Sequence, residues 1–190
     1  VAESARTIAL QMLEERGRGA VLVGVARVDA ALEHLLLAVM APVHFKEDGL
    51  FQPERPLGSL GAKVYLARRL GLIDGQIERA LHTLRKLRNT FAHSAESASL
   101  TDPSNANRLA EVLAHARTNP LWEPLKSVLQ AQPLSPQGPL DRALRDYILL
   151  ITILVAFLEA AAKQLQPYQP AVVMGFAGVL RPGVDTPRQP

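Results

Sequence analysis

The sequence predicts an all-α protein, a single-domain helical bundle of about six helices. Apolar residues recur every three or four positions along most of the chain, which is the spacing of one helical face. The alternation typical of strands is nearly absent, and glycine, proline and capping residues separate the periodic segments. With 190 residues, the chain is long enough to bury one substantial core.

Glycine and proline mark where the first three helices are expected to end. Gly17 stops the first helix, Pro42 follows the long and nearly all-apolar second helix, and Gly71 closes the short third helix. Asp74 is expected to cap the fourth helix, because its carboxylate can accept hydrogen bonds from free backbone N–H groups. In chain order, the expected helices span 4–16, 20–40, 60–70, 77–94, 103–117 and 140–165.

The segments between these helices are rich in proline and polar residues. Residues 41–58 are expected to form a loop, and residues 118–138, with several prolines and glutamines, a long connection. The domain is therefore expected to occupy residues 1–165. Residues 166–190 are expected to be an extended or disordered C-terminal tail, whose apolar part could dock on a partner or on another copy.

Composition narrows the classes of function. The formal charge of +3 and the pI of about 9.5 suit an acidic partner such as RNA, but are far from those of a dedicated nucleic-acid binder. The chain has no cysteine and no histidine spacing typical of metal sites, so we expect neither a metal nor a cofactor. Val1 is not followed by a leader-like segment, and no apolar run is long enough for a bilayer. We therefore expect a cytoplasmic protein without membrane contact.

Arg88 stands out in the fourth helix because it falls inside the apolar arc. Apolar residues from Ile77 to Phe91 form one face, and at about 100° per residue Arg88 lies within it. An arginine directed at a core needs a counter-charge. The nearly all-apolar second helix carries Asp29 and Glu33 four residues apart, so we expect one of them to pair with Arg88.

The string from Arg88 to His93 has a second interpretation. An arginine followed after four to six residues by a histidine resembles the hallmark of the HEPN superfamily of helical RNA-processing and interaction domains. The pattern alone is weak, because Arg27 with His34 and Arg108 with His115 also satisfy it. Its context distinguishes the Arg88 match, which ends an amphipathic helix and has Asn89 directly after the arginine.

A broader resemblance covers about residues 17 to 165. The segments RGAVLVGVARVDAALEHLLLAVM, PLGSLGAKVYLARRLGLID, LRKLRNTFAHS and LDRALRDYILLITILVAFLEAAAK are similar to the mannitol operon repressor family, which is usually placed within or beside the HEPN group. The resemblance implies an all-helical, HEPN-like fold and self-association, with a homodimer as the expected state. It also favours a non-catalytic regulator that acts through contacts with a protein partner.

The alternative function is a metal-independent HEPN-type endoribonuclease with a composite site at a dimer interface. In that reaction the ribose 2′-hydroxyl attacks the adjacent phosphate, His93 assists proton transfer, Arg88 stabilises the developing charge and Asn89 orients the imidazole or the phosphate. On an unbroken helix Arg88 and His93 point about 140° apart. One site therefore requires either a helix end at Ala92 or residues from two subunits.

Two further hypotheses concern the polar side of the same helix and the fold itself. His82, Arg85 and Lys86 could form a strip that binds RNA phosphates, although an ordinary solvated face is the simpler interpretation. Direct reading of DNA is not expected, because no helix-turn-helix with a basic recognition helix is evident. The remaining hypothesis is a purely structural dimerisation domain in which Arg88 is a buried tie.

Overall fold

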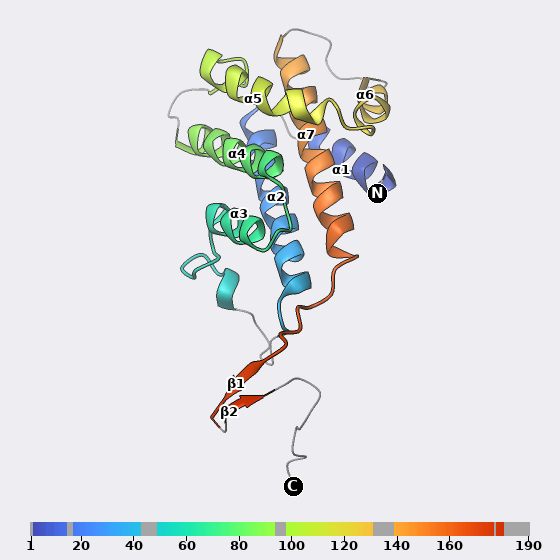
Figure 1. The fold of residues 1–190 in the computed structure, drawn as a ribbon. Helices are drawn as coiled ribbons and strands as arrows, with labels where there is room; N and C mark the ends of the chain where they lie inside the picture. Colours follow the sequence, from blue (N-terminus) through green and yellow to red (C-terminus); the bar gives the residue numbers. More distant parts are fainter. Residues whose placement is uncertain are drawn as a thin grey trace.

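The computed structural model describes residues 2–14, 17–42, 49–93, 98–130, 139–176 and 178–180. Within these residues the fold is all-α, as the sequence predicts, with a short hairpin near the C-terminus (Figure 1). The α-helices are α1 (Ala2–Glu14), α2 (Arg18–Val39), α3 (Leu60–Arg69), α4 (Gly75–His93), α5 (Pro103–Ala116), α6 (Trp122–Gln130) and α7 (Pro139–Ala162). A 3-10 turn spans Gly49–Phe51, and the strands are β1 (Val173–Gly175) and β2 (Gly178–Leu180).

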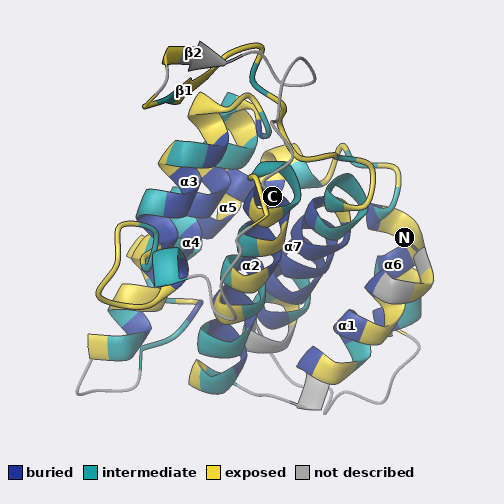
Figure 2. Ribbon diagram, turned by 90° about the horizontal axis from the view of Figure 1, so that it is seen from below, coloured by how far each residue is buried: buried dark blue, intermediate teal, exposed yellow. Residues whose placement is uncertain are grey.

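Helices α2 and α7 form the centre of the bundle. Helix α7 packs against α1, α2, α5 and α6, while α2 also packs against α3 and α4. Both are rich in apolar residues, as expected of helices that are covered on several sides, and residues 147–156 of α7 are all buried. In Figure 2 the buried residues lie on the inward sides of the surrounding helices.

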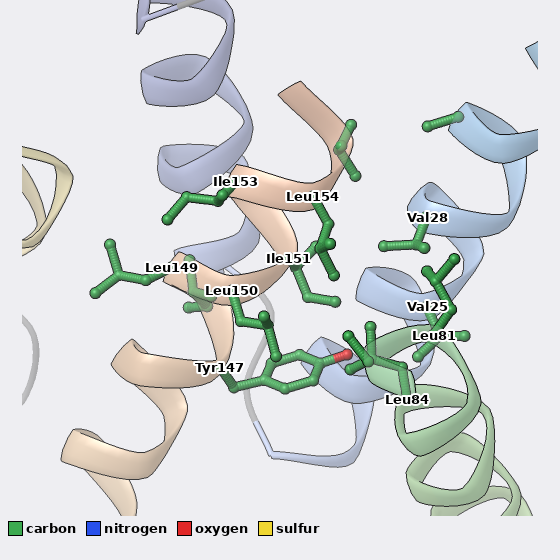
Figure 3. Close-up of a cluster of buried hydrophobic side chains, with 14 of the residues drawn as sticks. Val25, Val28, Leu81, Leu84, Tyr147, Leu149, Leu150, Ile151, Ile153 and Leu154 are labelled. Atoms are coloured by element: carbon green, nitrogen blue, oxygen red, sulfur yellow. The ribbon is translucent and has the colours of Figure 1, made fainter. Parts of the chain in front are cut away.

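One close contact joins the two central helices. The buried hydroxyl of Tyr147 on α7 donates a 2.9 Å hydrogen bond to the carbonyl oxygen of Val21 on α2. Figure 3 shows the ring among apolar side chains, with its oxygen directed toward α2. A Cβ placed on Gly24 would lie 2.6 Å from the Tyr147 hydroxyl oxygen and 2.9 Å from the terminal methyl of Met12. Glycine at position 24 therefore makes room for this hydrogen bond.

The predicted signals at the C-terminal end of α3 and at the start of α4 are confirmed, and a side-chain cap that was not predicted begins α3. Ser59 accepts a hydrogen bond from the N–H of Ala62 at the start of α3. Gly71, just after α3, has a positive φ of 73°, the left-handed conformation that favours glycine. Asp74 Oδ1 accepts hydrogen bonds from the N–H groups of Gln76 and Ile77, at 2.9 and 2.8 Å, and so caps α4.

Two elements are present that the sequence pattern did not indicate. Helix α6 lies inside the expected long connection, and the antiparallel hairpin β1–β2 lies inside the expected tail, with Val173 opposite Leu180. The segment before the hairpin is held to the bundle by the N–H of Tyr168, which donates a 2.8 Å hydrogen bond to the carbonyl oxygen of Val39. Position 94, the expected last residue of the fourth helix, and residues 181–190 of the tail lie outside the described residues.

Among the helices of the described ranges, none is both long enough and apolar enough to cross a bilayer.

Candidate interaction surface on α3 and α4

Asp29 and Glu33 of α2 have a cationic partner, and that partner is Lys63 of α3. The Lys63 ammonium lies 2.9 Å from Asp29 Oδ1 and donates a 2.8 Å hydrogen bond to Glu33 Oε2. Lys63 is only 3% exposed, whereas both carboxylates are partly open to solvent. The ammonium also lies 5.8 Å from the ring centroid of Phe51. The three charges therefore tie α2 to α3.

Two opposed effects act on the pKa of Lys63. Burial disfavours the charged ammonium and lowers the pKa, but the hydrogen bond to Glu33 and the nearby charge of Asp29 favour it. The net result is a pKa raised above the ordinary value of 10.5. Lys63 therefore stays protonated in the folded protein at neutral pH.

The expected pairing of Arg88 with Asp29 or Glu33 is wrong. Arg88 is exposed, and its Nη1 donates a 3.3 Å hydrogen bond to the side-chain oxygen of the adjacent Asn89. In the second half of α4 the buried residues are Leu84, Leu87 and Phe91, and Arg88 falls beside this narrower stripe. Neighbouring helices cross a helix at an angle, so the set of side chains that they bury changes along its length. A helical face averaged over the whole of α4 does not show this change.

The signal for Lys63 was present in the sequence. Leu60, Val64 and Ala67 form the buried stripe of α3, and Lys63 lies on the same side. Lys63, and not Arg88, is the cation on a core-facing stripe that requires a counter-charge.

The three residues of the Arg–His motif are accessible but do not converge within one chain. Arg88, Asn89 and His93 are all exposed, and α4 continues as a helix through His93. The helix end at Ala92 that would allow one chain to form the site is therefore absent. The carbonyl oxygen of Ala92 instead accepts a 3.0 Å hydrogen bond from Arg18 Nη2, which places a cation at the negative end of the helix.

The structure separates the predicted basic strip into two parts. His82 and Arg85 turn toward α3: the His82 ring lies 5.0 Å from that of Tyr65, and a Cβ at Gly61 would meet Arg85 Nη1 at 3.5 Å. Lys86 is exposed. The buried Nε of Arg85 has no hydrogen-bond partner among the described residues.

Positive charge is concentrated on α3, α4 and their connection. Residues 60–93 contain seven lysines and arginines and two acids, a net charge of +5, whereas the whole chain carries +3. The rest of the chain is therefore net −2. In the part of the chain that the structure describes, no carboxylate pairs with Arg85, Lys86 or Arg88. We call the surface formed by Arg85, Lys86, Arg88, Asn89 and His93 the basic face.

Within the described residues, no three histidines, aspartates or glutamates come together in a way that could hold a metal ion.

The bundle defines the chain as an all-helical protein with a basic face on α4, and comparison with solved structures agrees with that architecture. A chain in the X-ray structure of the MtlR–HPr complex from Escherichia coli matches with a TM-score of 0.55 and 20% identity, over 80% of this chain and 99% of that chain. The fold is therefore MtlR-like. No protein-family model matches the sequence, and no curated protein matches it.

Proposed function

We propose that the protein is a non-catalytic regulator that acts by binding an acidic surface of another protein through the basic face. The observation that carries this proposal is the concentration of charge. Residues 60–93 are net +5 within a chain of +3, and three cations lie within four positions of α4 without a carboxylate partner among the described residues. Unpaired surface cations favour and orient an oppositely charged partner.

The fold suggests which partner to test first. The similar solved structure is a complex of MtlR with HPr, and the sequence resembles the mannitol operon repressor family. We therefore propose an HPr-type protein from the same organism as the partner. Control of a sugar-alcohol operon is the kind of regulation that the family resemblance suggests for this chain.

The test measures HPr binding by calorimetry for the parent and for two charge variants. Lys86→Glu/Arg88→Glu reverses two charges on the basic face, whereas Arg6→Glu/Arg142→Glu makes the same change at exposed arginines of α1 and α7. The proposal predicts loss of binding in the first variant and near-parental binding in the second. Equal binding by all three proteins, or no binding by the parent, would reject it.

A metal-independent endoribonuclease of HEPN type remains a second candidate. The observation in its favour is that Arg88, Asn89 and His93 are all exposed, with Arg88 hydrogen-bonded to Asn89. Because the helix is unbroken through His93, this reaction requires two copies that face each other at α4.

The nuclease candidate has its own test. Total RNA is incubated with the parent in EDTA, beside His93→Ala and the matched control His115→Ala on α5, whose histidine is also exposed. Cleavage by the parent and the control, but not by His93→Ala, would support the nuclease. Absence of cleavage by all three would reject the nuclease.

A further inference from the structure

An apolar groove opens on the side of the bundle where α4, α5 and α7 meet. It has a volume of about 500 Å³, which is within the range of ligand-binding pockets in proteins. Its walls include Ile77 and Ala80 of α4, Val112 and Ala116 of α5, and Leu154 and Phe157 of α7. Phe157 is 41% exposed, which is unusual for a phenylalanine in a helix otherwise so deeply buried.

The charges at the rim of the groove have both signs. Asp74 and Glu111 lie there with Arg79 and His115, and Asp74 is already engaged as the cap of α4. A strongly acidic or strongly basic occupant would meet like charges on one side. The groove therefore favours an occupant that is apolar and uncharged.

The hairpin β1–β2 lies in an apolar and uncharged segment, and its described side chains Val173, Met174 and Phe176 are open to solvent. From Tyr168 to Leu180 the sequence contains no charged residue. Met174 is 82% exposed and Phe176 is fully exposed, and Val172 and Val173 are also open to solvent. Exposed apolar groups gathered in this way are typical of an interaction site. Figure 1 shows the hairpin projecting from one end of the bundle, beyond the Tyr168–Val39 hydrogen bond that holds its base.

We infer that the hairpin of one copy inserts Met174 and Phe176 into the groove between α4, α5 and α7 of a second copy, in a reciprocal exchange that forms a homodimer. Each hairpin covers on the order of 400 Å² of its apolar surface in this way. Counted on both partners and for both arms, the interface is on the order of 1,600 Å², the size of a standard stable interface. Exchange of an identical element is an established route to symmetric dimers.

The first experiment measures mass in solution by light scattering across a wide range of protein concentration. The parent is expected to form a dimer, and Met174→Ser/Phe176→Ser and Phe157→Glu are each expected to be monomeric. Leu70→Ser, which changes an exposed leucine at the end of α3, is the control and keeps the dimer. Mixing the hairpin variant with the groove variant restores one intact arm and groove, so a weaker heterodimer is expected. A monomeric parent, or a dimer that survives the hairpin variant, would overturn the inference.

The second experiment uses the absence of cysteine from the chain to trap the contact. A protein with Met174→Cys is mixed with one carrying Phe157→Cys, and a covalent heterodimer is expected on oxidation. Replacing Phe157→Cys with Leu70→Cys should abolish it. In a chain that carries both Met174→Cys and Phe157→Cys, an internal bridge without dimer would mean that the hairpin folds back on its own groove, and would overturn the exchange.

Discussion

Lys63 on α3 donates a 2.8 Å hydrogen bond to Glu33 on α2 and lies 2.9 Å from Asp29 on the same helix. The buried ammonium is satisfied by two carboxylates that remain partly open to water. The helix α3 that carries Tyr65 and supports one side of α4 is thereby fixed to the central helix α2.

Replacing this lysine is expected to destabilise the fold. Lys63→Met keeps the apolar stem but removes the ammonium, so two neighbouring carboxylates lose their counter-charge. The expected loss in the free energy of unfolding is about 1 to 3 kcal/mol. It is limited because water can still hydrate the two partly exposed carboxylates. Urea unfolding measures it, and Arg69→Met, at an exposed arginine on the same helix, is the control with little expected change.

The free energy of unfolding is expected to fall at alkaline pH because two groups, Lys63 and Tyr147, have raised pKa values in the folded state. The pKa of Lys63 is raised in the folded state, so its contribution is fully present below 10.5 and is lost as pH rises through the folded value. Burial raises the pKa of Tyr147 well above its ordinary value of 10.0, so above that pH the unfolded state ionises first. Unfolding midpoints between neutral pH and strongly alkaline pH should therefore decrease in the parent and decrease less in Lys63→Met/Tyr147→Phe. Parallel curves for the two proteins would contradict this assignment.

The glycine that faces Tyr147 should not tolerate a methyl group. Gly24→Ala would place a Cβ 2.6 Å from the Tyr147 hydroxyl, so a loss of about 1 to 3 kcal/mol is expected from overpacking. Tyr147→Phe loses about 1 kcal/mol with its hydrogen bond. Because removing the hydroxyl also removes the nearest clash, the double variant should be more stable than the sum of the two losses predicts. A double-mutant cycle of unfolding free energies measures the coupling between Gly24→Ala and Tyr147→Phe. Strictly additive losses would argue against the contact between these two residues.

A substitution at a buried hydroxyl on α7 is expected to stabilise the fold. Thr152 is fully buried, and its hydroxyl has no hydrogen-bond partner within the described structure. Thr152→Val replaces that hydroxyl by a methyl of the same shape, so stability is expected to rise by up to about 1 kcal/mol. The thermal midpoint measures the change, and Thr83→Val at a half-buried position of α4 is the comparison. A destabilised Thr152→Val would indicate an unrecognised polar partner.

If the basic face binds HPr, the affinity should depend on salt. Exposed charges are screened over about 8 Å at physiological ionic strength, so binding should weaken steadily as salt is added. Lys86→Ala should bind more weakly at low salt and show a shallower salt dependence than the parent. Calorimetric titrations at several salt concentrations give both slopes, and identical slopes would place the contact elsewhere.

Local chemistry accounts for the parts of the fold that could be predicted. Gly71 and Asp74 act within a few residues of themselves, so the C-terminal end of α3 and the start of α4 follow from sequence alone. Helix α6 was missed because Pro124 was interpreted as part of a proline-rich connection, although proline is tolerated in the first turn of a helix.

Contacts between helices at the candidate site could not be predicted from the sequence. The sequence by itself determined that the chain is helical, that Asp29 and Glu33 need a cation, and that positive charge gathers at residues 60–93. Only the tertiary structure decided that Lys63 supplies that cation, that Arg88 is exposed, and that an apolar groove and an uncovered hairpin exist in the same chain. The reason is physical: periodicity defines the faces of one helix, but the side chains that meet between helices depend on where and at what angle the helices cross.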